Sequence, residues 1–559
     1  MNRPVPAPVP APTRALRAPD EVMRLECLGA SHPTRLSFLR TLMRRAAREG
    51  WRFTRPLWEI DAEGYGRAVY RVDTGARSYC LVAFAHYLQD ERRTDRVIAE
   101  AWDTSYALYD GVPDTAEIER LEANVPRQEA GRFTARELTL SRANKSVRLF
   151  DSLVARLARG AMPDEAAIEA VGYLMRTTAV YGNGKFGIAD RDVLRDRPEL
   201  GGPFQAEMLT VWLIRSFTLD LAEHCARALG GDRAVALEPR LRRRIGVGNS
   251  TGLGMAPFLV RHPTLLHAWI HARETALARV RALPAITPED HRLLLAAIDR
   301  AREVAGSWAT IDAVQTARIA GLRADLDRLH EAAARLDPGL DHPCDRLYRF
   351  ACEALGMEAR EYAAALLIEP FGALVDDLTE TMAVDEDALW HMGGTLPARD
   401  LLARIDDAYG WTGRIDFADP MSDARFWYVS ADKLEPRLGE RREEPGADRE
   451  QPLAIARDVT RLKAYLGTLP PERTVAEIVL ERPDWRHVIQ RVLLLSRDHL
   501  YGEVRDNLLS AALRPIDLLR CKLAFFGADQ FDPRSDRWLR ISMFRGAPFP
   551  EELSAGEAA

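Results

Sequence analysis

The sequence predicts a mainly α, multi-helical globular protein with a small β-hairpin near the N-terminus and a short C-terminal strand. Apolar residues recur at helical spacing over most of the chain, which is typical of amphipathic helices packed on a core. Proline and glycine stand where these periodic stretches begin and end. Alternating β-prone runs are confined to two short regions, residues 68–84 and 538–544.

The N-terminal part of the chain is expected to contain two regions. Residues 1–30 begin with a Pro/Ala-rich run that offers little apolar surface to bury, so we expect a disordered tail. Residues 31–140 are expected to form an α+β region that starts with an amphipathic helix at 35–49. Its hairpin consists of two β-prone runs in residues 68–84, on either side of an Asp-Thr-Gly turn. From 116 to 159 the pattern is helical again.

The rest of the chain is predicted to be helical. Residues 141–340 form a region with two Gly-rich loops, and its clearest helices are expected at 163–181 and 203–230. Residues 341–559 form a second helical region. It is interrupted by a charged loop at 437–452 that carries proline and glycine.

Composition limits the class of protein. A chain of 559 residues is long enough for several domains. Its 83 acidic and 77 basic residues are interspersed and give a net charge of −6, which argues against nucleic acid as the main partner. The six cysteines include no CxxC pair and favour a reducing cytoplasm. No apolar run approaches the ~18 residues of a membrane span.

Lysine is rare in this chain, which has five lysines and 72 arginines. Lys145, Lys185 and Lys433 lie in the segments that most resemble sites. A retained lysine indicates a position that needs a compact ammonium or a group able to lose its proton, which arginine cannot supply. The alternative is a coding preference for arginine that left five lysines by chance.

The stretch Gly246–Gly254 is the strongest candidate for a ligand-binding loop. Its glycines allow backbone N–H groups to surround a ligand, and its short polar side chains add donors and acceptors. The glycine spacing fits neither a Walker A motif nor a dinucleotide fingerprint. The alternative is a tight turn between helices. The ligand-binding residues expected here are Gly248, Asn249, Ser250, Thr251, Gly252 and Gly254.

A second glycine-rich loop, Tyr181–Gly187, contains Asn183 and Lys185. We expect Lys185 to be the catalytic acid/base group or an anion ligand, with Asn183 and the preceding Arg176 binding the ligand. The alternative is a helix C-cap with an exposed lysine that complements the helix dipole.

The run Ser141–Ser146 places Arg142, Asn144 and Lys145 on a segment that we expect to be helical. These three polar side chains are predicted to face a cleft and to bind the same ligand. The alternative is a helix start with Ser141 as its N-cap.

His267 and His271 share a helix face at i,i+4 spacing, which suits a pair of metal ligands. No third ligand can be named, so we expect ordinary surface or core histidines and no metal site.

These observations favour a cytoplasmic enzyme that acts on a small carboxylated or phosphorylated metabolite bound by the Gly-rich loops, with neither nucleic acid nor a membrane as partner. No motif specifies a reaction class, a cofactor or an oligomeric state. The alternative function is a non-catalytic helical scaffold or regulatory protein in which the Gly-rich segments are structural turns.

Overall fold

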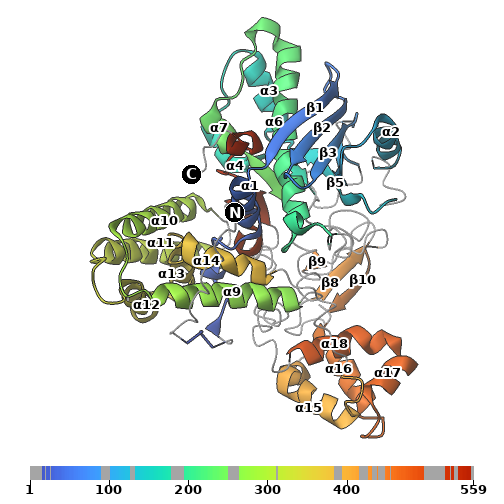
Figure 1. Cartoon of the computed structure of the whole chain (residues 1–559), viewed down its shortest axis with the longest axis vertical. Coiled ribbons are helices and arrows are strands. Elements are labelled where there is room, and N and C mark those ends of the chain that lie inside the picture. Colours follow the sequence, from blue (N-terminus) through green and yellow to red (C-terminus); the bar gives the residue numbers. More distant parts are fainter. Residues whose placement is uncertain are drawn as a thin grey trace, which may run out of the picture. The chain divides into compact units, whose positions relative to one another are not determined.

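The structure is a computed structural model of the whole chain, in which the helices and strands fall into two compact units (Figure 1). The first unit comprises residues 1–36, 256–307 and 313–518, and the second comprises 37–255, 308–312 and 519–559. The described residues are 15–18, 21–24, 27–89, 101–125, 133–177, 194, 196–249, 263–309, 313–382, 393–414, 426–430, 437–438, 447–452, 455–495, 523–528, 530–533 and 539–554.

The prediction of a mainly α protein with one hairpin is wrong, because the second unit is built on a large mixed sheet. Nine strands of the described chain form it in the order β1-β2-β3-β4-β5-β6-β7-β12-β11. Neighbours are antiparallel except β6 and β7, which are parallel. The strands are β1 (Arg52–Ile60), β2 (Gly66–Asp73), β3 (Ser78–Ala85), β4 (Thr104–Asp110), β5 (Glu137–Lys145), β6 (Tyr173–Thr177), β7 (Gly246–Asn249), β11 (Gln530–Pro533) and β12 (Leu539–Met543).

The expected hairpin is present as β2 and β3, with Gly75 at a φ of 88° in the turn between them. The expected C-terminal strand is β12, which is not an edge strand. It pairs with β7 on one side and with β11 on the other.

Two segments that we expected to be helical are strands in the structure. Gly172 takes a left-handed φ of 73° and ends α4 (Glu165–Val171), so the following residues enter the sheet as β6. β5 contains the run Ser141–Lys145. Both strands are almost fully buried, so they lack the apolar/polar alternation of a half-exposed strand.

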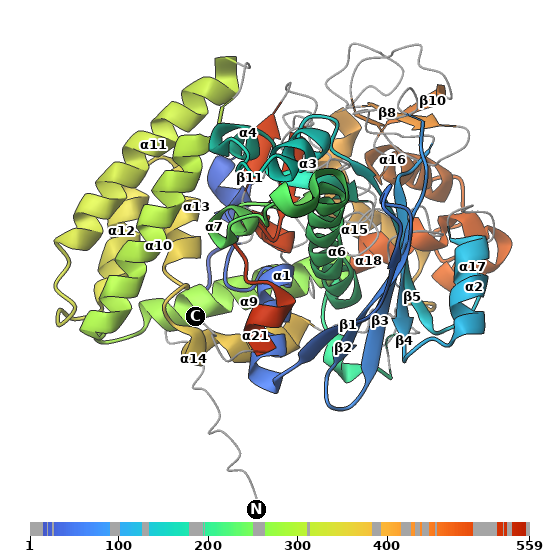
Figure 2. The same ribbon diagram turned by 90° about the horizontal axis from the view of Figure 1, so that it is seen from above.

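Helices cover both faces of this sheet, as Figure 2 shows. The long helix α6 (Gln205–Gly230) packs against one face, where Phe217 contacts Tyr70 and Tyr106. α2 (Thr115–Asn124) packs against the other face through Ile118 and Leu121. The other α-helices among the described residues of this unit are α1 (Phe38–Glu49), α3 (Phe150–Ala158), α4, α7 (Pro239–Arg243) and α21 (Pro550–Ser554).

The first unit is mostly helical, as expected from its periodicity. Its described α-helices are α9 (Pro263–Arg281), α10 (Pro288–Ser307), α11 (Ala313–Ala334), α12 (Pro343–Ala354), α13 (Met357–Leu366), α14 (Gly372–Val375), α15 (Ala398–Tyr409), α16 (Ile455–Leu466), α17 (Val475–Glu481) and α18 (Arg486–Leu495). α15 to α18 enclose their own apolar core, which includes Leu401, Leu462 and Ile489. None of the helices in the described parts of the chain is both long and apolar enough to cross a membrane.

Two segments of the first unit differ from the expected loops. Part of the expected charged loop at 437–452 is strand, because β9 (Arg437–Leu438) and β10 (Ala447–Pro452) pair with β8 (Phe426–Ser430). Part of the expected N-terminal tail is also ordered. Residues 15–18, 21–24 and 27–30 of the tail are described, and the side chain of Arg17 is buried there.

Candidate functional site

A set of polar side chains lies on the α2 side of the sheet, beside the apolar residues that α2 covers. Arg142 stands opposite Ser105 in the β4–β5 ladder, and Asn144 stands opposite Arg176 in the β5–β6 ladder. Directly opposite residues of an antiparallel pair share a face, and so do positions i and i+2 of one strand. We call Ser105, Arg142, Asn144 and Arg176, together with His86, the polar face.

Arg142 is held by an aromatic ring. Its guanidinium carbon lies 4.4 Å from the centre of the Trp102 ring, within the range of a cation–π interaction. Asn144 positions this ring through the backbone. Its Oδ1 accepts from the N–H of Asp103 at 2.9 Å, and its Nδ2 donates to the carbonyl of Ala101 at 3.1 Å. The side chain of Asn144 thus supports the backbone on both sides of Trp102, and its expected role in ligand binding stays a prediction.

Arg142 and Arg176 bring two positive charges to this face. Each is only 7% exposed. They are diagonal neighbours across β5 and β6, which corresponds to about 7–8 Å between backbones. Asp103, also buried, contributes a carboxylate whose Oδ2 accepts from the N–H of Lys145 at 2.9 Å. Arg142 and Arg176 together carry two positive charges, and Asp103 carries one negative charge.

His86 and Ser105 form a hydrogen-bonded pair at the same end of the sheet. The Nε2 of His86 lies 2.9 Å from the Oγ of Ser105, and the backbone N–H of His86 donates to the carbonyl of Asp103 at 2.8 Å. Burial lowers the pKa of His86 and outweighs the opposing effect of Glu122 and Asp103. The imidazole is therefore neutral at neutral pH and able to accept a proton.

The polar face lies where both Gly-rich segments leave the sheet. β6 and β7 are parallel, so their carboxyl ends, Thr177 and Asn249, point to the same edge. In open sheets with parallel strands, ligands bind preferentially outside the carboxyl ends of the strands. The expected site residues that follow these strands are outside the described residues, namely Asn183, Lys185, Ser250, Thr251, Gly252 and Gly254.

The first two glycines of the stretch Gly246–Gly254 belong to β7 and have packing roles. A Cβ on Gly248 would lie 2.7 Å from the Tyr173 ring, and one on Gly246 would collide with Met543 and Ser542. The side chain of Asn249 donates to the carbonyl of Thr177 at 3.3 Å. Gly248 and Asn249 therefore have roles in the sheet itself, and the ligand binding expected of them stays a prediction.

Lys145 is separated from the other candidates by the pleat of β5. Because successive side chains of a strand point to opposite faces, Lys145 lies on the α6 side with its ladder partner Met175. The sulfur of Met175 accepts a hydrogen bond from Tyr106 there at 2.9 Å. The Nζ of Lys145 lies 4.9 Å from the centre of the Phe150 ring. On the expected helix, Lys145 would have been near Arg142.

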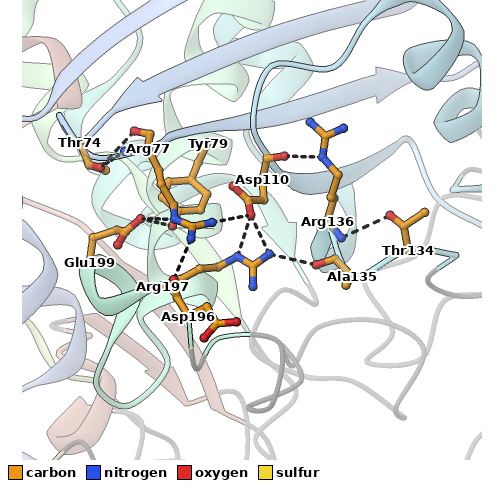
Figure 3. Close-up of polar contacts among 10 residues, drawn as sticks. All are labelled: Thr74, Arg77, Tyr79, Asp110, Thr134, Ala135, Arg136, Asp196, Arg197 and Glu199. Atoms are coloured by element: carbon orange, nitrogen blue, oxygen red, sulfur yellow. Dashed lines mark hydrogen bonds and ion pairs between the residues drawn. The ribbon is translucent and has the colours of Figure 1, made fainter.

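Residues 196–200 contact the sheet through a network of ion pairs (Figure 3). Arg197 contacts Asp110 at the end of β4, with an Nη2–Oδ2 distance of 2.6 Å. Arg77 bridges Asp110 at 3.2 Å and Glu199 at 3.7 Å. Burial and the adjacent Glu199 raise the pKa of Tyr79, so its hydroxyl stays protonated and donates to Glu199. This network fixes Arg197 and Glu199 to the ends of β3 and β4.

The histidine pair on α9 forms no metal centre with other described residues. The rings of His267 and His271 are 6.0 Å apart. Within the described residues, no group of three or more His, Cys, Asp or Glu side chains is placed to hold a metal ion.

Three residues of this site, His86, Trp102 and Ser105, were missed by the sequence reasoning. His86 follows a β-prone run and Ser105 begins the next strand, so a predicted β3–β4 pairing would have brought them together. No family model matches the chain, and neither a curated protein nor a solved structure shows significant similarity to it.

Proposed function

We propose that the chain is a cytoplasmic enzyme acting on a small carboxylated or phosphorylated metabolite, which binds at the polar face of the sheet-bearing unit. The observation that carries the proposal is the placement of Arg142 and Arg176 on one face, both buried, beside the neutral His86. The five described cysteines Cys27, Cys80, Cys225, Cys344 and Cys352 are free thiols, which supports a reducing compartment.

The two arginines suit an anionic ligand for electrostatic reasons. A guanidinium group does not lose its proton, so its burial has to be compensated by anions or strong acceptors. Asp103 is a buried carboxylate of the same site, and its Oδ2 accepts from the backbone N–H of Lys145. A carboxylate or phosphate ligand offers two oxygen acceptors in the two-pronged geometry that arginine recognises.

His86 gives this site a group for proton transfer. A neutral imidazole is a suitable general base near neutral pH, and its hydrogen bond to Ser105 fixes the direction of the ring. We retain Lys185 as the proposed catalytic acid/base group contributed by the segment between Thr177 and Arg197. His86 and Lys185 would then act on the same bound anion.

Binding of inorganic phosphate and of small di- and tricarboxylates, measured by calorimetry and by thermal shift, tests the ligand class. An anion at about 100 times its Kd should stabilise the folded chain by about 2.7 kcal/mol. Arg142→Gln and Arg176→Gln should each weaken binding at least tenfold. Arg67→Gln is the matched control, because Arg67 lies on the same face of the sheet in β2 but pairs at the surface with Glu59 and Glu122. Equal binding by all three variants would contradict the proposal.

The catalytic part is tested by screening turnover of small phosphate monoesters and carboxylic acids. We expect His86→Gln to lower kcat on any substrate found by about 100-fold while anion binding is retained. Loss of binding without a change in kcat would assign His86 to ligand binding alone.

One observation favours the alternative of a non-catalytic scaffold or regulatory protein. Gly246 and Gly248 are required by the packing of β7, so these two glycines are explained without a ligand. Under this alternative, none of the anions would stabilise the chain, and substitutions on the polar face would change stability only.

A further inference from the structure

Arg17 is clamped between two glutamates in the first unit. Its Nε and Nη2 donate to the two carboxylate oxygens of Glu274, each at 2.7 Å. Its Nη1 and Nη2 donate to the two oxygens of Glu361 at 2.5 Å and 3.3 Å. All three nitrogens of the guanidinium group are used, and both carboxylates are engaged in the two-pronged geometry specific to arginine.

The charges of this cluster are balanced and buried. Arg273 donates from Nη2 to Glu361 at 2.9 Å, and its Nη1 lies 3.6 Å from Glu274. Two arginines therefore face two glutamates. The side chains of Arg17, Arg273, Glu274 and Glu361 are 6%, 2%, 1% and 3% exposed. Without Arg17, two buried carboxylates would share the single positive charge of Arg273.

The two sides of this contact differ in construction. Glu274 lies on α9 and Glu361 on α13, so helices hold both carboxylates. Gly29 lets η2 (Leu28–Ser31) pack against α13 here, because a Cβ at Gly29 would collide with the Glu358 backbone. Arg17, by contrast, comes from residues 15–18, which have neither helix nor strand structure.

Among residues 15–18, Arg17 is the one that is buried. Ala15 and Ala18 are exposed and Leu16 is half-buried, whereas Arg17 is buried. Hot-spot residues of protein interfaces are often arginines that insert into a fully desolvated pocket of the partner, as Arg17 does here. The contact therefore resembles a receptor with a bound peptide more than the packing of two structural elements.

We propose that Glu274 and Glu361 form a guanidinium-binding site, which the N-terminal segment fills in cis through Arg17. The ligand class of this site is the side chain of arginine or a small alkylguanidinium. A lysine ammonium or an alkylamine does not fit, because a compact ammonium cannot bridge two carboxylates through a planar fork. The inference concerns the first unit and is independent of the anion site proposed in the second.

Chemical rescue tests the proposal. Arg17→Ala in the full chain should lower the melting temperature, and propylguanidinium, which is the arginine side chain without its backbone, should restore part of it. At about ten times its Kd, the compound should raise the melting temperature of the variant by about 2–4 °C and leave the wild-type chain unchanged. Propylammonium at the same concentration is the control and should have no effect on either chain. Equal responses of the variant and the wild type, or equal effects of the two compounds, would overturn the proposal.

A second variant covers the case in which Arg17→Ala does not fold. The double variant Arg17→Ala, Glu361→Gln retains one positive and one negative side chain, Arg273 and Glu274, so its charges balance again. We expect it to fold, to melt at a higher temperature than the single variant, and to show no stabilisation specific to propylguanidinium. A double variant no more stable than Arg17→Ala would show that the carboxylates do not form a site for this cation.

Discussion

Arg17 donates two hydrogen bonds of 2.7 Å to Glu274, a residue 257 positions further along the chain. The pair is buried, and Glu361 completes the clamp around the same guanidinium group. A segment that follows a Pro/Ala-rich run is thereby fixed to a helix of the first unit. We therefore expect Arg17, a residue near the N-terminus, to contribute to the stability of this unit.

Truncation of the N-terminus should distinguish Arg17 from the residues before it. Removal of residues 2–14 should leave the free energy of unfolding unchanged within about 0.5 kcal/mol. Removal of residues 2–18 should cost about 3–5 kcal/mol, because it leaves buried carboxylates without their cation. Denaturant unfolding of both truncated chains measures the difference. Arg292→Ala is the control, since its ion pair with Glu289 is exposed and should matter little.

Acid should weaken the first unit through Glu361. Burial by itself raises the pKa of this carboxyl, but the charges and hydrogen bonds of Arg17 and Arg273 outweigh it and lower the pKa to about 2. The unfolded chain takes up the proton near 4.5, so the contribution of Glu361 is complete above that pH and is lost as the pH falls toward 2. Unfolding measured between pH 6 and pH 2 should show this loss, and Glu361→Gln should flatten the slope. An unchanged slope in the variant would contradict the assignment.

Mild acid should destabilise the second unit through His86. Burial lowers the pKa of this imidazole in the folded chain below the value of 6.5 expected when it is unfolded. The unfolded state therefore binds more protons, and stability is greatest above pH 6.5 and declines as the pH falls below it. His86→Gln should remove this part of the decline. Burial also lowers the pKa of His271, so the decline that His271 causes should remain in this variant. Proton NMR titration of both imidazoles provides a direct check.

Gly248 should tolerate no side chain, whatever binds nearby. Gly248→Ala places a methyl group 2.7 Å from the Tyr173 ring in a buried strand, so we expect a loss of about 1–3 kcal/mol. Gly321→Ala is the matched control, because the space around Gly321 in α11 is open. That change should stabilise the chain by up to about 1 kcal/mol through helix propensity. Thermal unfolding of both variants without ligand measures these effects. Wild-type stability of Gly248→Ala would show that β7 can move away from β6.

The sequence by itself determined the elements whose signals are local. The long helix α6 follows from apolar periodicity with proline and glycine at its ends, and the β2–β3 hairpin follows from its turn. The candidate residues Arg142, Asn144 and Arg176 were also identified by local composition, and the structure brings them to one face.

Only the tertiary structure decided which residues share a face and which partners they meet. β5 and β6 are buried on both sides, so their sequences carry no alternation that separates a strand from a short buried helix. β7 pairs with β12, which lies more than half of the chain length further along the sequence. Arg17 contacts glutamates that lie 257 and 344 positions away. The distant strand accepts and donates the backbone hydrogen bonds that a four-residue strand needs, and the distant glutamates balance the charge of the buried arginine. Because these energies arise between distant segments, no window of the sequence contains them.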